Sequence, residues 1–127
     1  MLFEHFALNV PDAKAMAGWY AKNCSMKVVR GMNQAPFTHF LADSSGRVVM
    51  EIYTNPDAPF TDLAEKDPLY FHFALIVDNP EKARKDLKQQ GAIYVSEVRP
   101  EEGSVLIMIR DPWGVPLQLV KRAEPLK

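Results

Sequence analysis

The alternation of apolar and polar positions divides the chain into two stretches with the same order of elements. In the first stretch, residues 2–10 alternate as a strand does, and an apolar stripe with helical spacing follows over residues 13–20. Three further strand-like segments come next, at residues 26–32, 36–42 and 47–54. This pattern predicts a strand, a helix and three strands.

The second stretch repeats that order. A strand over residues 69–77 is followed by Asn79 and Pro80, a helix cap and a first-turn proline, and Gly91 marks the helix end. Strands are then expected at residues 93–98, 105–110 and 115–121. We therefore predict a single domain of the α+β class, built from two βαβββ modules. Its expected parts are module 1 at 1–55, a linker at 56–68, module 2 at 69–122 and a frayed tail at 123–127.

The two stretches are copies of one another. The segment from His5 to Val10 returns 67 residues later, from His72 to Val77, with five of six residues identical. At the same offset, residues 48–53 correspond to residues 115–120. Two matches at one offset indicate an internal repeat.

Each copy carries a metal-ligand type of residue at both ends of its pattern. His5 and His72 begin the first strand of each module, and Glu51 and Gln118 lie 46 residues later on the last strand. If a pseudo-twofold axis relates the modules, these four side chains can converge. Two imidazoles, one carboxylate and one amide oxygen suit Zn²⁺, Ni²⁺, Co²⁺, Mn²⁺ or Fe²⁺. The alternative is that the repeat is only architectural and the histidines are buried polar groups left from an ancestral site.

Composition narrows the function classes. The 127 residues carry 15 basic and 16 acidic side chains without long runs and a net charge of −1, so no nucleic-acid surface is implied. No apolar run is long enough to span a membrane, and the N-terminus lacks the features of a signal peptide. The single cysteine, Cys24, cannot form an internal disulfide, so we expect a cytoplasmic protein. His39 has no repeat partner, since position 106 is Leu106, and we interpret it as a core or surface histidine.

These residues resemble the vicinal oxygen chelate superfamily over essentially the whole chain. That superfamily includes glyoxalase I, extradiol dioxygenases, methylmalonyl-CoA epimerase and the fosfomycin- and bleomycin-resistance proteins. The motifs that carry the resemblance are His5-x-x-Leu8-x-Val10-x-Asp12 with Trp19-Tyr20, Glu51-Ile52, His72-x-Ala74-x-x-Val77, and Asp111-Pro112-x-Gly114 leading to Gln118-Leu119. The resemblance implies cupped mixed sheets around a central cleft. It also implies a homodimer with the metal site between modules.

Individual family members match unequally. Bacterial-type glyoxalase I agrees at His5, Glu51 and His72, but it has Glu where this chain has Gln118 and Arg where it has Asn9. Both departures argue against glutathione dependence. Methylmalonyl-CoA epimerase has a similar ligand set with the two halves exchanged. An extradiol dioxygenase needs Glu in the last position, which makes that activity the weakest match.

The leading hypothesis is a metal-dependent, glyoxalase-like enzyme of the lyase or isomerase type. It would bind a small substrate with vicinal oxygens and abstract a proton through a metal-bound enediolate, with Glu51 as the base and His5, His72 and Gln118 as further ligands. The alternative is a metal-free protein that binds a small molecule or drug, as bleomycin-resistance proteins do. By strand alternation, the expected substrate-pocket residues are Asn9, Val49, Tyr53, Asn55, Ile76 and Val120.

Overall fold

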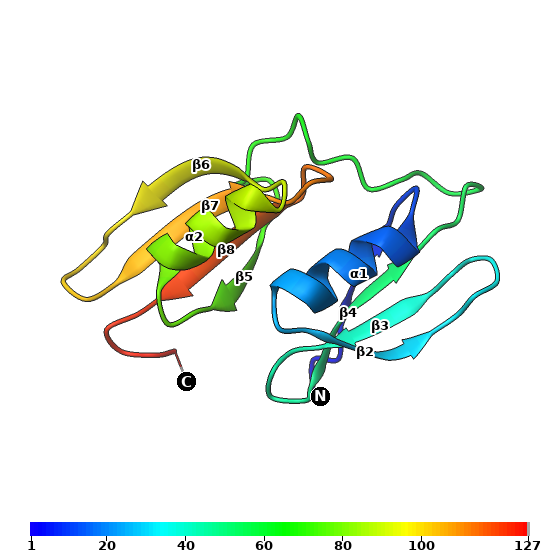
Figure 1. Cartoon of the computed structure of the whole chain (residues 1–127), viewed down its shortest axis with the longest axis horizontal. Helices are drawn as coiled ribbons and strands as arrows, with labels where there is room; N and C mark the ends of the chain where they lie inside the picture. Colours follow the sequence, from blue (N-terminus) through cyan, green and yellow to red (C-terminus); the bar gives the residue numbers. More distant parts are fainter. Residues whose placement is uncertain (127) are drawn as a thin grey trace. The chain divides into compact units, whose positions relative to one another are not determined.

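The computed structural model describes residues 1–126, which form two helices and eight strands. They make two βαβββ modules of the α+β class, each with its own four-stranded mixed sheet (Figure 1). The predicted fold class is therefore confirmed. The chain divides into two compact units, Met1–Thr61 and the residues from Asp62 onward. This boundary lies inside the segment that the sequence assigns to the linker.

The first unit folds its strands around one helix. Its elements are β1 (Phe6–Asn9), α1 (Ala13–Asn23), β2 (Lys27–Gly31), β3 (His39–Ala42) and β4 (Val48–Tyr53). The strand order is β1-β4-β3-β2, with β1 parallel to β4 and the other neighbours antiparallel. The helix buries Ala13, Met16, Ala17 and Tyr20, the stripe expected from the sequence. Burying a side chain such as Met16 fully stabilises the fold by roughly 1.5–3 kcal/mol.

The second unit repeats this topology. Its elements are β5 (Phe73–Ile76), α2 (Pro80–Gln89), β6 (Ile93–Val98), β7 (Val105–Arg110) and β8 (Pro116–Lys121). The strand order is β5-β8-β7-β6, with β5 parallel to β8. Apolar residues of β7 and β8 form the core, including Ile107, Ile109, Leu117 and Leu119, each at most 1% exposed. The sheet contributes a larger share of the core in this unit than in the first, because α2 buries only Pro80 and Leu87.

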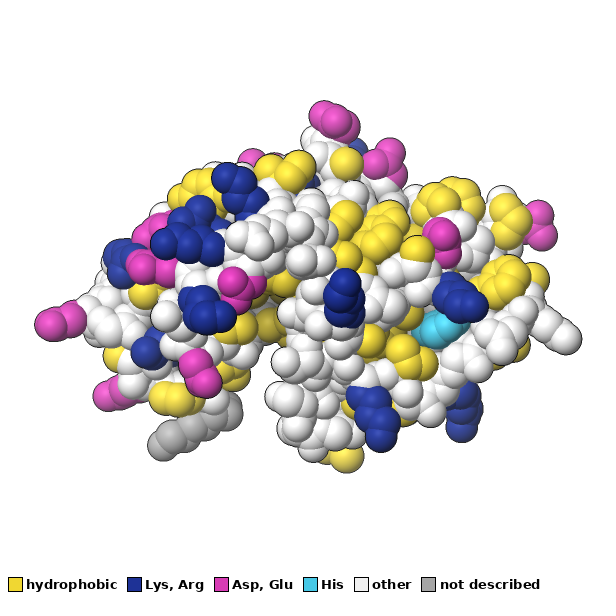
Figure 2. Space-filling model, in the orientation of Figure 1, with side chains coloured by type: hydrophobic (Ala, Val, Ile, Leu, Met, Phe, Trp, Pro, Cys, Tyr) yellow, Lys and Arg dark blue, Asp and Glu magenta, His cyan; other side chains and the backbone are white. Residues whose placement is uncertain are grey.

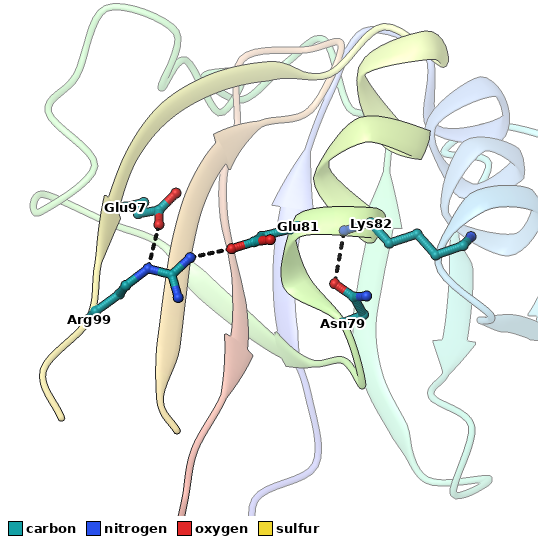
Figure 3. Close-up of polar contacts among 5 residues, drawn as sticks. All are labelled: Asn79, Glu81, Lys82, Glu97 and Arg99. Carbon is teal, nitrogen blue, oxygen red and sulfur yellow. Dashed lines mark hydrogen bonds and ion pairs between the residues drawn. The ribbon is translucent and has the colours of Figure 1, made fainter. Parts of the chain in front are cut away.

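Both helices begin where the sequence predicts. The Asp12 side chain accepts a hydrogen bond from the Ala15 amide at 3.0 Å, and Asn79 does the same for the Lys82 amide at 3.1 Å (Figure 3). Pro80 is the first helical residue, where its missing N–H costs no hydrogen bond. Arg99, just after β6, donates to Glu97 of β6 at 2.8 Å and also to Glu81 of α2, and the second of these ion pairs links the helix to the sheet edge (Figure 3).

The third predicted strand is wrong at its beginning. It starts at His39 instead of position 36, because Phe37 has φ +56°, a left-handed backbone conformation that a strand does not contain. His39 then lies opposite Ile52 on the core face of the sheet and is 7% exposed. Its Nδ1 donates to the Phe37 carbonyl at 2.6 Å. The sequence left open a core or a surface position for His39, and the structure places it in the core.

A β-bulge in β4 changes the spacing between the two copies of the repeat by one residue. Along β4, Val48 pairs with Ala42 and Met50 with Leu41, so Val49 is an extra residue without a partner of its own. The corresponding stretch of β7 and β8 has no such shift. The repeat offset is therefore 67 at β1, 68 over β3 and the beginning of β4, and 67 again after the bulge. The residue equivalent to His39 is consequently Ile107, and the sequence-based alignment with position 106 was wrong by one.

Charged groups of both signs are mixed on the face shown in Figure 2. This agrees with the small net charge of −1. Within residues 1–126, no helix has the length and apolar character needed to cross a membrane.

Candidate functional site

The first unit brings the histidine and the acid of its repeat into contact. Ala7 of β1 pairs with Glu51 of β4, and His5 lies two residues before Ala7, on the same face of the sheet. His5 Nε2 is 2.9 Å from Glu51 Oε2, and 26% and 23% of the two side chains are exposed. The sequence predicted that these residues belong to one site, and the structure places them side by side.

Two further side chains surround His5. Glu4 Oε1 is 2.9 Å from Nδ1, the other ring nitrogen. The ring of Phe40 stands edge-on to the imidazole, with 5.6 Å between ring centroids, and Phe40 pairs with Glu51 across β3 and β4. A carboxylate oxygen only accepts, so Nε2 donates to Glu51, and a metal ion would bind at Nε2 in place of that proton while Glu4 holds the ring through Nδ1. Sequence reasoning missed both neighbours, although Glu4 adjoins His5 in the chain.

The second unit holds its pair in a different setting. Ala74 of β5 pairs with Gln118 of β8, and His72 lies two residues before Ala74, so the strand positions of His5 and Glu51 are reproduced. Here the histidine has a backbone partner, since Nδ1 lies 2.9 Å from the Pro68 carbonyl oxygen. Because a carbonyl only accepts, Nδ1 carries the proton and Nε2 carries the lone pair. Gln118 pairs on its other side with Met108, which is 6% exposed.

The donor atoms of the first unit fit a divalent transition-metal ion. Imidazole nitrogen and carboxylate oxygen each bind such an ion at about 2.1 Å, so two ligands at a right angle stand about 3 Å apart. The 2.9 Å between His5 Nε2 and Glu51 Oε2 matches this spacing. Among residues 1–126, no three His, Cys, Asp or Glu side chains gather closely enough to hold an ion.

Two of the expected pocket residues fix a loop. Asn9 is 5% exposed, and its amide nitrogen donates to the carbonyls of Asn55 at 2.9 Å and Pro59 at 3.1 Å. Its amide oxygen accepts from the Asn55 backbone at 2.8 Å, and the Asn55 side chain accepts from the Asp57 amide at 3.0 Å. Asn9 thereby fixes the chain that leaves β4. Val49 and Tyr53 are half-buried, Val49 as the extra residue of the bulge.

The other two expected pocket residues, Ile76 and Val120, line a pocket of about 320 Å³ in the second unit. Ile76 is 86% exposed, whereas Val120, its partner across β5 and β8, is 4% exposed. The wall opposite the sheet comes from Pro125 and Leu126. The sequence predicts a frayed tail at residues 123–127; residues 123–126 are exposed, the Ala123 amide donates to the Ser104 hydroxyl at 2.9 Å, and residue 127 lies outside the described residues.

Comparison with known proteins places this architecture in a family. The sequence profile of the Glyoxalase/Bleomycin resistance protein/Dioxygenase superfamily matches residues 2–119. The chain belongs to this superfamily. The resemblance inferred from the sequence motifs is thereby confirmed. Each of the two βαβββ modules of this superfamily member forms one four-stranded sheet.

Its relatives among characterised proteins are distant. A lactoylglutathione lyase of Escherichia coli O157:H7 is 27% identical over 131 aligned positions, which cover 98% of this chain and 95% of that protein. A lactoylglutathione lyase of Salmonella typhimurium is 25% identical over 95% of this chain and 93% of its own length. The superfamily member described here is thus distantly similar to lactoylglutathione lyases.

Solved structures share the fold. A glyoxalase family protein from Enterococcus faecalis superposes with a TM-score of 0.69 and 22% identity, covering 94% of this chain and 96% of that one. Glyoxalase I from Zea mays gives a TM-score of 0.73 and 22% identity, covering 96% of this chain and 45% of the maize protein. At these identities, the likeness shows the fold alone.

Proposed function

We propose that this protein is a metal-dependent, glyoxalase-like lyase or isomerase that acts on a small substrate with two neighbouring oxygens. The observation that carries the proposal is the half-buried contact of 2.9 Å between His5 Nε2 and Glu51 Oε2. His72 and Gln118 occupy the same strand positions in the second unit. In the proposal these four residues hold one ion of Zn²⁺, Ni²⁺, Co²⁺, Mn²⁺ or Fe²⁺, with the halves paired within one chain or across a homodimer.

Each residue has a distinct role in the proposed reaction. When bound, the ion supplies Lewis acidity, which polarises a substrate carbonyl and acidifies the neighbouring C–H bond. Glu51, the only carboxylate among the four, accepts the proton from that carbon and returns it to the adjacent carbon. Glu4 holds the His5 ring through Nδ1, and Phe40 covers the edge of that ring and limits the access of water. His72 is held by the Pro68 carbonyl.

The test is proton exchange into substrate carbons, followed by NMR in deuterated water. The names of the two relatives make glutathione adducts of 2-oxoaldehydes the first candidates, with acyl-CoA epimers as the second. We expect exchange that EDTA abolishes and one of the five metals restores. Glu51→Gln should lower the exchange rate by at least about 100-fold, the range of general-base catalysis. Glu102→Gln removes one exposed carboxylate elsewhere and serves as the matched control.

A metal-free binder of a small molecule or drug is the second candidate function. The observation that favours it is the largely apolar pocket of the second unit. A protein of this kind would take up none of the five ions and would catalyse no exchange, and Glu51→Gln would leave ligand binding unchanged. The exchange experiment and a metal titration therefore separate the two candidates.

A further inference from the structure

The pocket of the second unit opens on the same face of the sheet as Gln118. Gln118 pairs with Ala74, and Val120 pairs with Ile76 two residues further along the strands. Paired residues of parallel strands point to one side, so Ala74, Ile76 and Val120 continue the surface that begins at Gln118. These three residues line the pocket, whose volume of about 320 Å³ suits part of a small molecule.

The chain after β8 builds the opposite wall. The Ala123 amide donates to the buried Ser104 hydroxyl at 2.9 Å, and Ser104 is 1% exposed. Beyond this anchor, Pro125 and Leu126 line the pocket. Leu126 is 80% exposed, so its apolar side chain is not packed into the core. The tail therefore supplies further apolar surface to the pocket that Ile76 lines.

Charged residues lie at the far end of the pocket. Lys121 and Arg122 follow β8, and Asp78 follows β5; all three line the pocket. Within residues 1–126, neither Lys121 nor Arg122 has an acidic side chain at ion-pair distance. Two cations against one carboxylate leave one net positive charge. At roughly 3.3 Å per residue, Arg122 lies on the order of 13 Å from Gln118 along the strand.

We propose that this pocket binds the non-reacting end of the substrate, and that this end is an apolar chain that terminates in a carboxylate. The apolar chain would lie along Ile76 and Leu126, and the carboxylate would be bound by Arg122, which shares the strand alternation of Gln118 and Val120, with Lys121 adding positive charge beside it. This proposal rests on the proposed function, because Gln118 marks the reacting end. It assigns the specificity of the enzyme to the second unit and to its C-terminal tail.

The test uses octanoate as the probe and its neutral analogue octanamide as the comparison, both in EDTA so that no metal takes part. We expect octanoate to shift the backbone amide NMR signals of residues 74–78 and 120–126. We also expect octanamide to bind about tenfold more weakly, since one hydrogen bond to a charged group contributes roughly 1.5–3 kcal/mol. Equal binding of the two probes, or shifts confined to other residues, would overturn the proposal.

Matched variants locate the binding residues. Lys121→Gln combined with Arg122→Gln should weaken octanoate binding about tenfold, and Leu126→Ala should weaken octanoate and octanamide alike. Lys14→Gln combined with Lys85→Gln removes the same charge from two exposed helix positions and should leave binding unchanged. If both double variants weaken binding equally, the pocket assignment is wrong.

The outcome is independent of whether the chain holds a metal. Loss of metal uptake with octanoate bound as expected would overturn the proposed enzyme and leave the carboxylate pocket in place. Metal uptake without octanoate binding would overturn the pocket and leave the enzyme. Kinetics would then be compared for two substrates of equal length, one with and one without the terminal carboxylate. In the Lys121→Gln/Arg122→Gln variant, KM should rise only for the substrate that carries the carboxylate.

Discussion

The two halves of the chain place equivalent residues at equivalent strand positions but surround them differently. His5 stands between two carboxylates, those of Glu4 and Glu51, each 2.9 Å from one ring nitrogen. His72 is held by a backbone carbonyl, and Gln118, which pairs with Ala74, is neutral. Among the four proposed ligands, the first half thus provides the only carboxylate. In the proposed reaction, the first half would supply the base and the second would supply neutral donors.

A second difference lies two pairs further along the strands. Asn9 is buried and fixes the loop after β4, whereas its counterpart Ile76 is exposed and lines a pocket. The same position of the repeat therefore closes the sheet surface in one half and leaves it open in the other. We infer that the repeat preserved the ligand positions while the positions beside them diverged toward structure in one half and ligand binding in the other.

Exchanging the acid and the amide gives the largest expected effect. Glu51→Gln alone should lower turnover by at least about 100-fold because the base is lost. The double variant Glu51→Gln with Gln118→Glu restores the charge of the ligand set and should restore metal uptake. Turnover should stay low, because the carboxylate then lies on β8 beside Met108 and lacks the neighbours Phe40 and Glu4 that the first half provides. Full recovery of turnover would show that the two halves are interchangeable.

The second largest effect is expected from exchanging Asn9 and Ile76, and it concerns stability. Asn9→Ile gives the first half the residue of the second and leaves the carbonyls of Asn55 and Pro59 without their donor. We expect a loss of about 3 kcal/mol in the free energy of unfolding, measured in urea, since each buried unsatisfied group costs roughly 1–3 kcal/mol. Ile76→Asn, at an exposed site, should change it by less than about 0.5 kcal/mol. Equal effects would contradict the structural role of Asn9.

Removing the carboxylate that orients His5 should have a moderate effect. Mutating a residue that holds a metal-binding histidine in place typically weakens metal affinity by about 10–100-fold. Glu4 is exposed, so we expect Glu4→Gln to raise the metal Kd by about tenfold, the low end of that range. Glu4→Asp should recover part of the loss. An unchanged Kd in a metal titration would mean that the Glu4 contact does not orient the ring.

The smallest expected effect concerns the turn between β3 and β4. The Ser45 hydroxyl, which donates to Asp43, lowers the pKa of that carboxyl below its ordinary value. A lowered pKa in the folded state stabilises the protein above the unfolded-state pKa, and the contribution is lost as pH falls through the folded-state pKa. Ser45→Ala should therefore destabilise the protein slightly at neutral pH and converge with the parent in acid.

Most of the fold could be predicted from the sequence because it depends on local, repeated signals. The five identities around His5 and His72, the caps at Asp12 and Asn79, and the turn glycines each act within a few residues. The His5–Glu51 contact followed from strand alternation on this repeat. This contact could be predicted because pairing between parallel strands fixes which residues share a face of the sheet.

What the sequence did not reveal depends on tertiary contacts. The bulge at Val49 shifts the repeat by one residue and leaves no local signature in an apolar strand. Strand alternation placed Asn9 on the right strand, but the loop carbonyls that bind it come from residues 55–59, 46 or more positions away. The hydrogen bond from the Ala123 amide to the Ser104 hydroxyl likewise joins positions 19 residues apart. None of these partners can be identified from neighbouring residues.

The central claim is that the two halves contribute to one metal site, and metal stoichiometry tests it most directly. Protein purified without a histidine tag would be titrated with each of the five ions after EDTA treatment, and bound metal would be measured per chain. We expect one ion per chain, lost both in Glu51→Ala of the first half and in His72→Ala of the second. Two ions per chain, or an ion retained when either half is altered, would contradict the claim.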